Sequence, residues 1–397
     1  MRFAALLLVS LAAWATASAQ NLPVLRIKAA KAIGPETRTE CTVALILPGQ
    51  TDPAKERDGE IKVRGASSQA YDKKSFSLKL DHPAALLDLP KNREWVLNAA
   101  FVDCSMMRHK VSYDLFRAMG APTAPRPSPG SRFIEVELNG RYHGLYLLMQ
   151  PVDDLLVGFP SPKDGDATPA VIYKAVDHAA NFGQPGHEGY DQRLPDPAKS
   201  PTWNPLEELN KFVSQSSDQA FRDPQTGIAS RLDVDNAIDF HLLVLLTSNL
   251  DGITKNYNLA RPAATKATPD PKFFFVPWDY DATFGRNWDG SRVDAKAWLS
   301  NRLFDRLLAD PAMRLRYARR WQELRAKTFT AEAIIALIDA NAATIGDASV
   351  RNEKRWKSLD YANPRERTFA NDVGQMKRWV PLRLAWLDAE LAGRTAR

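Results

Sequence analysis

The chain has 397 residues, a formal net charge of +6 at pH 7 and 44% hydrophobic residues. This length fits one large domain or two ordinary ones, and the composition excludes a disordered or fibrous protein. The basic residues are dispersed, and no nucleic-acid-binding signature is present. We therefore expect no nucleic-acid polymer as a partner, while a nucleotide or another small polyanion fits the positive balance.

The first residues, "MRFAALLLVSLAAWATASAQ", have the pattern of a secretory signal peptide. One basic residue precedes an apolar run, and small residues follow at Ala17 and Ala19. We predict a signal peptide over residues 1–19 and export to the periplasm or the cell exterior, the alternative being a structural helix. No transmembrane anchor is expected, because each apolar run is shorter than the ~20 residues that a spanning helix needs.

Two cysteines, Cys41 and Cys104, are present in the whole chain. An exported protein enters an oxidising compartment, where the two thiols could form a disulfide. Two separate buried thiols are the alternative, and the sequence leaves both open.

The N-terminal part, residues 20–157, reads as rich in β-strands. Short segments with β-branched and aromatic residues alternate with Pro, Gly and Asp clusters. A helix is expected over 104–120, with Ser105 as a possible N-cap and Gly120 as its stop. Asn139-Gly140 predicts a type I′ hairpin turn. The expected strands cover residues 22–27, 39–47, 60–65, 75–80, 93–99 and the two arms of that hairpin.

A loop-rich segment, residues 158–205, divides the chain and contains one expected strand, "AVIYKAV". The second half, residues 206–397, is mainly helical. A long apolar helix is expected after Asp233 or Asp235, and two strands are expected over 256–260 and 272–280. The pattern indicates an α+β fold with a β-rich N-terminal part and a helical C-terminal part.

The strongest candidate site follows that apolar helix, in "TSNLDGITKNYNLA" and "PWDYDATFG". Asp251 and Asn256 are five residues apart, and Asp279 and Asp281 follow one strand pair later. Phosphoryl transfer needs one carboxylate to orient the attacking hydroxyl, and further carboxylate and amide oxygens to hold metal ions. An ordinary helix end followed by a strand is the alternative, since Asp and Asn are common in loops.

A second candidate is the hairpin "IKVRGASSQAYDKKSFSLKL". Backbone N–H groups after Gly65 and the hydroxyls of Ser67 or Ser68 could lie over phosphates, with positive charge from Lys73, Lys74 or Arg64. A plain polar hairpin is the alternative.

The histidines offer no competing chemistry. No zinc-type Cys/His spacing and no G-x-S-x-G motif are present. His241 lies within the apolar helix and is interpreted as a core histidine with satisfied hydrogen bonds.

Five ordered segments resemble the CotH kinase family, over roughly residues 23 to 345. They are the two site segments above, the 61–80 hairpin, "EWVLNAAFVDCSMMRHKVSYDLFRAMG" and "FIEVELNGRYHGLYLLMQPVD". The resemblance implies a two-lobed, protein-kinase-like fold and phosphorylation of a protein substrate from ATP, with Mg²⁺ or Mn²⁺.

By the same resemblance, Asp251 matches the catalytic aspartate, and Asn256 and Asp279, with Asp281, match the metal-binding residues. Lys74 resembles the phosphate contact, and Gln150 stands where members usually have glutamate. Two other functions stay open: a catalytically inactive, exported surface or coat interaction protein, and a metal-dependent phosphate hydrolase. The expected cofactor-binding residues are Arg64, Gly65, Ser67, Ser68, Lys74 and Gln150.

Overall fold

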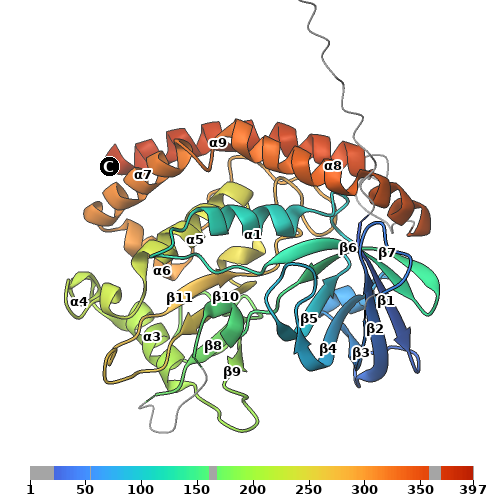
Figure 1. The fold of residues 1–397 in the computed structure, drawn as a ribbon. Helices are drawn as coiled ribbons and strands as arrows, with labels where there is room; N and C mark the ends of the chain where they lie inside the picture. Colours follow the sequence, from blue (N-terminus) through green and yellow to red (C-terminus); the bar gives the residue numbers. More distant parts are fainter. Residues whose placement is uncertain (1–21, 54, 161–167, 357–367, 397) are drawn as a thin grey trace, which may run out of the picture.

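A computed structural model describes residues 22–53, 55–160, 168–356 and 368–396, so the predicted signal peptide lies outside the described residues. A closed β-barrel forms most of the N-terminal part, and a second sheet with most of the helices forms the remainder (Figure 1). The predicted α+β class is thus confirmed. The N-terminal part is a seven-stranded barrel rather than the plain sheet of a kinase N-terminal lobe.

The barrel has the strand order β1-β2-β3-β4-β5-β7-β6, and a parallel pairing of β1 with β6 closes it. Every other neighbouring pair is antiparallel. Alternate residues point inward, as the strand period of two requires. Leu25, Ile61, Leu78 and Trp95 are fully buried in this interior. The strands are β1 (Val24–Ala29), β2 (Thr39–Ile46), β3 (Glu56–Arg64), β4 (Ser75–Ala84), β5 (Asn92–Asn98), β6 (Ser131–Leu138) and β7 (Arg141–Met149).

The turn between β6 and β7 is the predicted hairpin. Asn139 and Gly140 have φ angles of 50° and 75°, the left-handed conformation that both central positions of a type I′ turn require. Ladder pairing begins at once with Leu138 opposite Arg141. The prediction from Asn-Gly is confirmed.

Helix α1 (Arg108–Ala118) starts later than expected, so the assignment of Ser105 as its N-cap was wrong. A carboxylate oxygen of Asp103 accepts the N–H of Arg108 at 2.8 Å, and Ser105 is itself bound to Asp103. Met107, Val111, Leu115 and Met119 recur every four residues along this segment, and all four are buried, as the core face of a helix requires.

The second sheet has the order β11-β10-β8-β9, and all its pairs are antiparallel. The predicted strand pair before "WDYD" is confirmed as β10 and β11. The loop-rich segment contributes two strands to this sheet instead of one. The strands are β8 (Val171–Ala175), β9 (Tyr190–Leu194), β10 (Tyr257–Arg261) and β11 (Phe274–Pro277).

Helix α5 (Val234–Thr247) forms the centre of the C-terminal part. Asp233 caps it by accepting the N–H of Asn236 at 3.0 Å, as predicted. Every residue of this helix except Asp235 is buried. The other helices are α2 (Asp154–Val157), α3 (Asn204–Gln215), α4 (Asp218–Arg222), α6 (Arg302–Leu308), α7 (Pro311–Arg325), α8 (Ala331–Arg355) and α9 (Phe369–Ala396).

Helices α8 and α9 lie across the top of the molecule and connect its two parts (Figure 1). Helix α8 contacts β7 of the barrel and α9, while α9 contacts α5 and α7. By length and composition alone, α8 could cross a membrane. Its contacts with the barrel and α9 fit a helix packed on a folded domain.

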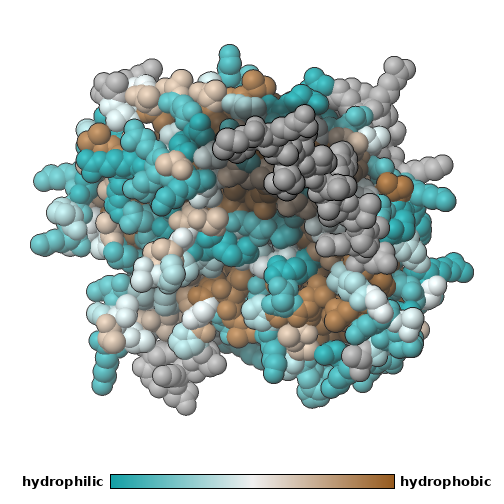
Figure 2. Space-filling view, turned by 45° about the horizontal axis from the view of Figure 1, so that its top comes forward, coloured by the Kyte–Doolittle hydropathy of each residue, from teal (hydrophilic) through white to brown (hydrophobic). Residues whose placement is uncertain are grey.

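Hydrophilic residues cover most of the face drawn in Figure 2, and hydrophobic residues gather around a hollow in its middle. Cys41 is buried and Cys104 is half-buried, and no disulfide joins them in the structure. The two cysteines therefore do not form a disulfide in this fold.

Candidate active site

Three side chains from two separate segments form a cluster with the composition of a metal site. His109 lies on the first turn of α1, and Asp279 and Asp281 follow β11. One ligand atom from each lies within 4.8 Å of the others. The structure thus brings the two predicted carboxylates together and adds a histidine that sequence reasoning missed.

The electrostatic environment shifts the pKa values of the two carboxyl groups in opposite directions. Burial and the nearby charge of Asp279 raise the pKa of Asp281 to about 7. Burial also acts on Asp279, but a 3.3 Å contact with Nε2 of His109 and the charges of His109, Lys174 and Arg64 lower its pKa overall. Two adjacent carboxylates repel one another when both are ionised, and a bound divalent cation removes that cost.

The backbone around the cluster is held in uncommon conformations. Asn256 and Asp279 both have a φ of 60°, in the left-handed region that side chains other than glycine seldom adopt. The N–H of Trp278 donates to the carbonyl of Asn256, so the two residues lie on adjacent chain segments. Such strain is maintained where the surrounding structure fixes it, frequently at functional sites.

Asp251 begins a short 3₁₀ turn, Asp251–Ile253, after α5. Its carboxylate lies 3.1 Å from Nζ of Lys255 and 3.7 Å from Nε2 of His178, and 35% of its side chain is exposed. The side chain of Asn249 joins this turn to the cluster of His109, Asp279 and Asp281: its Nδ2 donates to the carbonyl of Asp279, and its Oδ1 accepts the N–H of Gly252. Asn249 is a second positioning residue that the sequence did not single out.

A cavity of about 430 Å³ separates the barrel from the second sheet. Its wall includes Trp95 and Val96 of the barrel, Ile172 of β8 and Trp278, the residue before Asp279. Arg64 lines it from β3, with its guanidinium carbon 5.4 Å from the Trp278 ring. This volume lies within the usual range for small-molecule sites.

The hairpin predicted to cover phosphates forms a short 3₁₀ turn, Ser67–Ala70, after Gly65. Gly65 has a φ of 122°, and a Cβ there would clash with the hydroxyl of Ser68, so only glycine fits this position. Burial and the charges of Asp281 and Asp279 raise the pKa of the adjacent Tyr71, which indicates that the hairpin lies near these two carboxylates.

Lys74, the expected phosphate contact, has its ammonium group bound inside this hairpin. Its Nζ donates to the carbonyl of Gln69 at 2.8 Å and to the carbonyl of Tyr71. The structure therefore gives Lys74 a role in shaping the hairpin and does not direct its charge toward a ligand.

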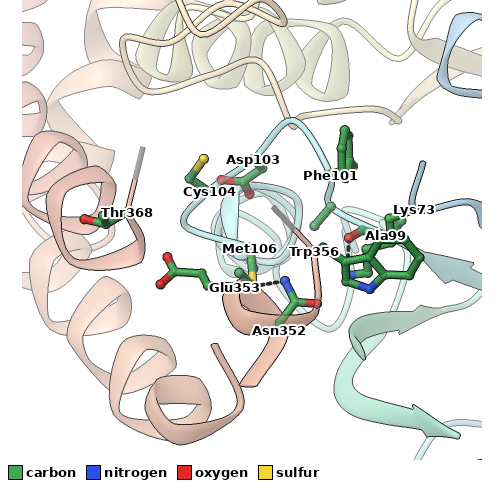
Figure 3. Close-up of a pocket in the computed structure, with 11 residues that line it drawn as sticks. Lys73, Ala99, Phe101, Asp103, Cys104, Met106, Asn352, Glu353, Trp356 and Thr368 are labelled. Carbon is green, nitrogen blue, oxygen red and sulfur yellow. Dashed lines mark hydrogen bonds between the residues drawn. The ribbon is translucent and has the colours of Figure 1, made fainter. Parts of the chain in front are cut away.

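Lys73 is buried and lines a different pocket, of about 250 Å³, between the barrel and the end of α8 (Figure 3). Its Nζ donates to the carbonyl of Ala99 at 2.7 Å and to that of Leu145, and lies 4.5 Å from the centre of the Tyr146 ring. Burial lowers its pKa well below the ordinary lysine value. These contacts already satisfy its donors, so Lys73 is also unsuited to bind phosphate without rearrangement.

Gln150 is buried at the end of β7 and is bound to Gly130. Its side-chain Oε1 accepts the backbone N–H of Gly130 at 3.1 Å, and its backbone N–H donates to the carbonyl of Gly130. The expected cofactor-binding role of Gln150 therefore has no support in its contacts.

The donor set of the cluster fits a divalent cation. Carboxylate oxygens suit Mg²⁺ and Mn²⁺, while an imidazole is a ligand more typical of transition metals. Together with the cations around the cavity, such a site can bind and polarise a phosphate ester.

Comparison with known proteins agrees with this chemistry. The family model described as "CotH kinase protein" matches residues 61–387. The chain is also 29% identical over 291 residues to the inner spore coat protein H of Bacillus subtilis (strain 168). That alignment covers 70% of this chain and 74% of the Bacillus protein.

Proposed function

Because the chain belongs to the CotH kinase family, we propose that it transfers the γ-phosphate of ATP to a hydroxyl group of a protein, with Mg²⁺ or Mn²⁺. One observation carries the proposal: the cavity between barrel and sheet is lined by Trp278, the residue directly before Asp279 of the carboxylate cluster. A phosphoryl group held at that boundary would meet both positive charge and metal-binding oxygens.

Each residue of the site has a separate part in this reaction. Asp251 orients the acceptor hydroxyl and takes its proton, while Asn249 holds the turn of Asp251 against Asp279. Asn256, Asp279 and Asp281 would hold the metal, with His109 either as a further ligand or as the hydrogen-bond partner that orients Asp279. When bound, the metal neutralises charge on the phosphates.

The walls of the cavity suit a nucleoside. Val152 and Leu194 line the cavity with partly exposed side chains and provide apolar surface for a base. Glu94 and Asp153 also line the cavity and offer acceptors for ribose hydroxyls. We also propose export, on the basis of the signal-peptide pattern over residues 1–19.

A second candidate function is an inactive surface or coat interaction protein. The relative from Bacillus is named as a spore coat protein, and Gln150 removes a charge that family members usually have at this position. In this case the protein would have the fold of the family but would neither bind nor cleave ATP.

One experiment separates these functions. Purified protein lacking residues 1–19 is incubated with γ-labelled ATP, a mixed protein substrate and either Mg²⁺ or Mn²⁺, beside Asp279→Asn. If the proposal is right, labelled phosphate appears on protein with the wild type and is absent with Asp279→Asn. Free labelled phosphate without labelled protein would indicate the hydrolase, and an absence of ATP binding would indicate the interaction protein.

A further inference from the structure

Two neighbouring strands of the second sheet place a lysine and an asparagine side by side in the cavity. Lys174 of β8 is paired directly with Asn258 of β10, and both line the cavity. The motif predicted from the sequence contains Asn256, so Asn258 was not expected to belong to the site.

Asn258 contains a buried hydrogen-bond donor without a partner. The residue is 2% exposed, and its Nδ2 makes no hydrogen bond to any described residue. An unsatisfied buried donor costs about 1–3 kcal/mol, so native proteins seldom keep one without a reason. Since the residue faces a cavity, a ligand with an acceptor atom is a physical explanation.

Lys174 and Arg64 are cations that likewise lack an anionic partner. Neither side chain makes a hydrogen bond or ion pair with any described residue. Nζ of Lys174 lies 5.9 Å and Cζ of Arg64 lies 5.4 Å from the centre of the Trp278 ring. Burial lowers the pKa of Lys174 to about 8, although the charge of Asp279 opposes this effect. Arg193, which also lines the cavity, is by contrast paired with Asp191 at 3.0 Å.

The charges of the cavity wall are therefore divided. Lys174 and Arg64 lie near Trp278 and within the field of Asp279, while the acidic side chains come from β5 and from the N-terminal end of α2. The acidic group includes Asp153, whose carboxylate binds Asn92 at 2.6 Å. An anionic group is accordingly favoured at the Trp278 end.

We propose that Lys174, Asn258 and Arg64 form the subsite for the phosphate groups of the nucleotide, in place of the expected Lys74. This inference rests on the proposed function for the identity of the ligand, but the subsite itself requires only an anion with several acceptor oxygens. Lys174 and Arg64 supply charge from opposite sides, one from the sheet and one from the barrel, and Asn258 supplies a neutral donor.

The test is a binding series by isothermal titration calorimetry in buffer with MnCl₂, using adenosine, AMP, ADP, ATP and inorganic tripolyphosphate. The variants are Lys174→Met and Asn258→Asp, and Lys62→Met on β3 is the matched control, because Lys62 does not line the cavity. The melting temperature of each variant without ligand shows that it is folded. If Asn258→Asp does not fold, Lys174→Met decides the test alone.

In Lys174→Met, we expect the affinity for ATP and tripolyphosphate to fall by roughly 10- to 100-fold, the range for a lost hydrogen bond to a charged group. Adenosine affinity should stay unchanged, and Lys62→Met should behave as wild type. Asn258→Asp should weaken ATP binding as well, because an acceptor with negative charge replaces the donor.

Three other outcomes overturn parts of this account in distinguishable ways. Wild-type affinity for ATP in both variants, or an equal loss for adenosine and ATP, contradicts the phosphate subsite and leaves the proposed function intact. Lys174-dependent binding of tripolyphosphate by a protein that does not bind ATP supports the subsite and contradicts the proposed function. If the wild type binds neither ATP nor tripolyphosphate, both are wrong.

Discussion

His109 changes the ligand set that the sequence predicted for the metal. The imidazole is buried, with 4% of its side chain exposed, and contacts Asp279 at 3.3 Å. Burial lowers its pKa, but the hydrogen bond with Asp279 and the charge of Asp281 raise it overall. Without metal, His109 acts as the counter-charge of the carboxylates; with metal, it can turn a lone pair toward the ion.

The first prediction concerns this histidine. His109→Gln keeps a polar group of similar size but removes the imidazole, so the Kd for Mn²⁺ should rise by roughly 10-fold or more. Calorimetric titration with MnCl₂ measures the change, and His82→Gln, at an exposed histidine, is the control. An unchanged Kd would show that His109 neither binds the metal nor orients its ligands.

The residues of the site differ in how far the sequence could indicate them. Asp279 and Asp281 are two positions apart after a strand, so their proximity follows from local geometry. His109 and Lys174 come from segments 170 and 105 positions before Asp279 (279 − 109 and 279 − 174), and only tertiary packing brings them to it. One local signal was available for Lys174: it is the single charged residue in the apolar strand segment "AVIYKAV".

Helix α5 contains the buried histidine that the sequence assigned to the core, and the structure confirms this interpretation. Nδ1 of His241 lies 3.0 Å from the hydroxyl of Tyr317, and Nε2 lies 2.8 Å from the carbonyl of Leu299. The ring stacks on Phe304 with 4.1 Å between centres. Burial lowers the pKa of His241 to about 4, so the folded protein holds it neutral at pH 7.

The second prediction follows from that shift. Between pH 6.5 and 4, the unfolded chain protonates this histidine while the folded chain does not, so stability is lost as the pH falls through this window. The free energy of unfolding should decrease by about 3 kcal/mol from this group at the acid end. His143, with a pKa also lowered by burial to about 4, adds to the same slope.

Urea titrations at several pH values measure this slope in wild type and His241→Gln. The loss of stability toward low pH should be smaller in this variant, and His82→Gln should behave as wild type. Equal slopes in wild type and His241→Gln would contradict the buried neutral histidine.

Helix α9 holds the site together through a buried ionic network. Asp372 accepts hydrogen bonds from Arg108 of α1, from Arg286 at 3.1 Å and from the N–H of Ser105 at 3.0 Å. Arg108 also binds Asp103 and donates to the carbonyl of Thr283. The start of α1, with His109, and the segment after Asp281 are thus fixed to the same helix.

The third prediction is that Asp372→Asn destabilises the fold by about 3 kcal/mol or more, because it leaves buried guanidinium groups without their counter-charge. Asp339→Asn is the matched control, since Asp339 pairs with Lys377 at the surface and should contribute under about 1 kcal/mol. Chemical denaturation measures both. A similar small loss in the two variants would show that the network does not maintain the packing of α9.

The strands and helices themselves were largely predictable, because their signals are local. Alternation in "SFSLKL", the Asn-Gly turn and the Asp233 cap each depend on a few adjacent residues. Closure of the barrel by β1 and β6 depends on the parallel pairing of Val24 with Glu135, across more than a hundred residues, and no local pattern encodes it. The same limit applies to the two strands that the loop-rich segment adds to the second sheet.

At the scale of the whole molecule, the proposed site lies at the boundary between barrel and second sheet. The barrel contributes Arg64 and apolar residues of the cavity, and the sheet contributes Lys174, Asn258 and the chain that leads to Asp279. Helices α8 and α9 contact both parts and keep them adjacent (Figure 1). A ligand bound at this boundary would contact both parts at once.

The most direct test of the account compares two carboxylates that it assigns to different tasks. Binding of ATP with Mn²⁺ and the rate of phosphate transfer to protein are measured together in wild type, Asp251→Asn and Asp279→Asn. Asp251→Asn should keep ATP affinity near wild type and lose roughly 10²–10⁴ in rate, whereas Asp279→Asn should lose both metal-dependent binding and transfer. Transfer at the wild-type rate in either variant would contradict the assignment.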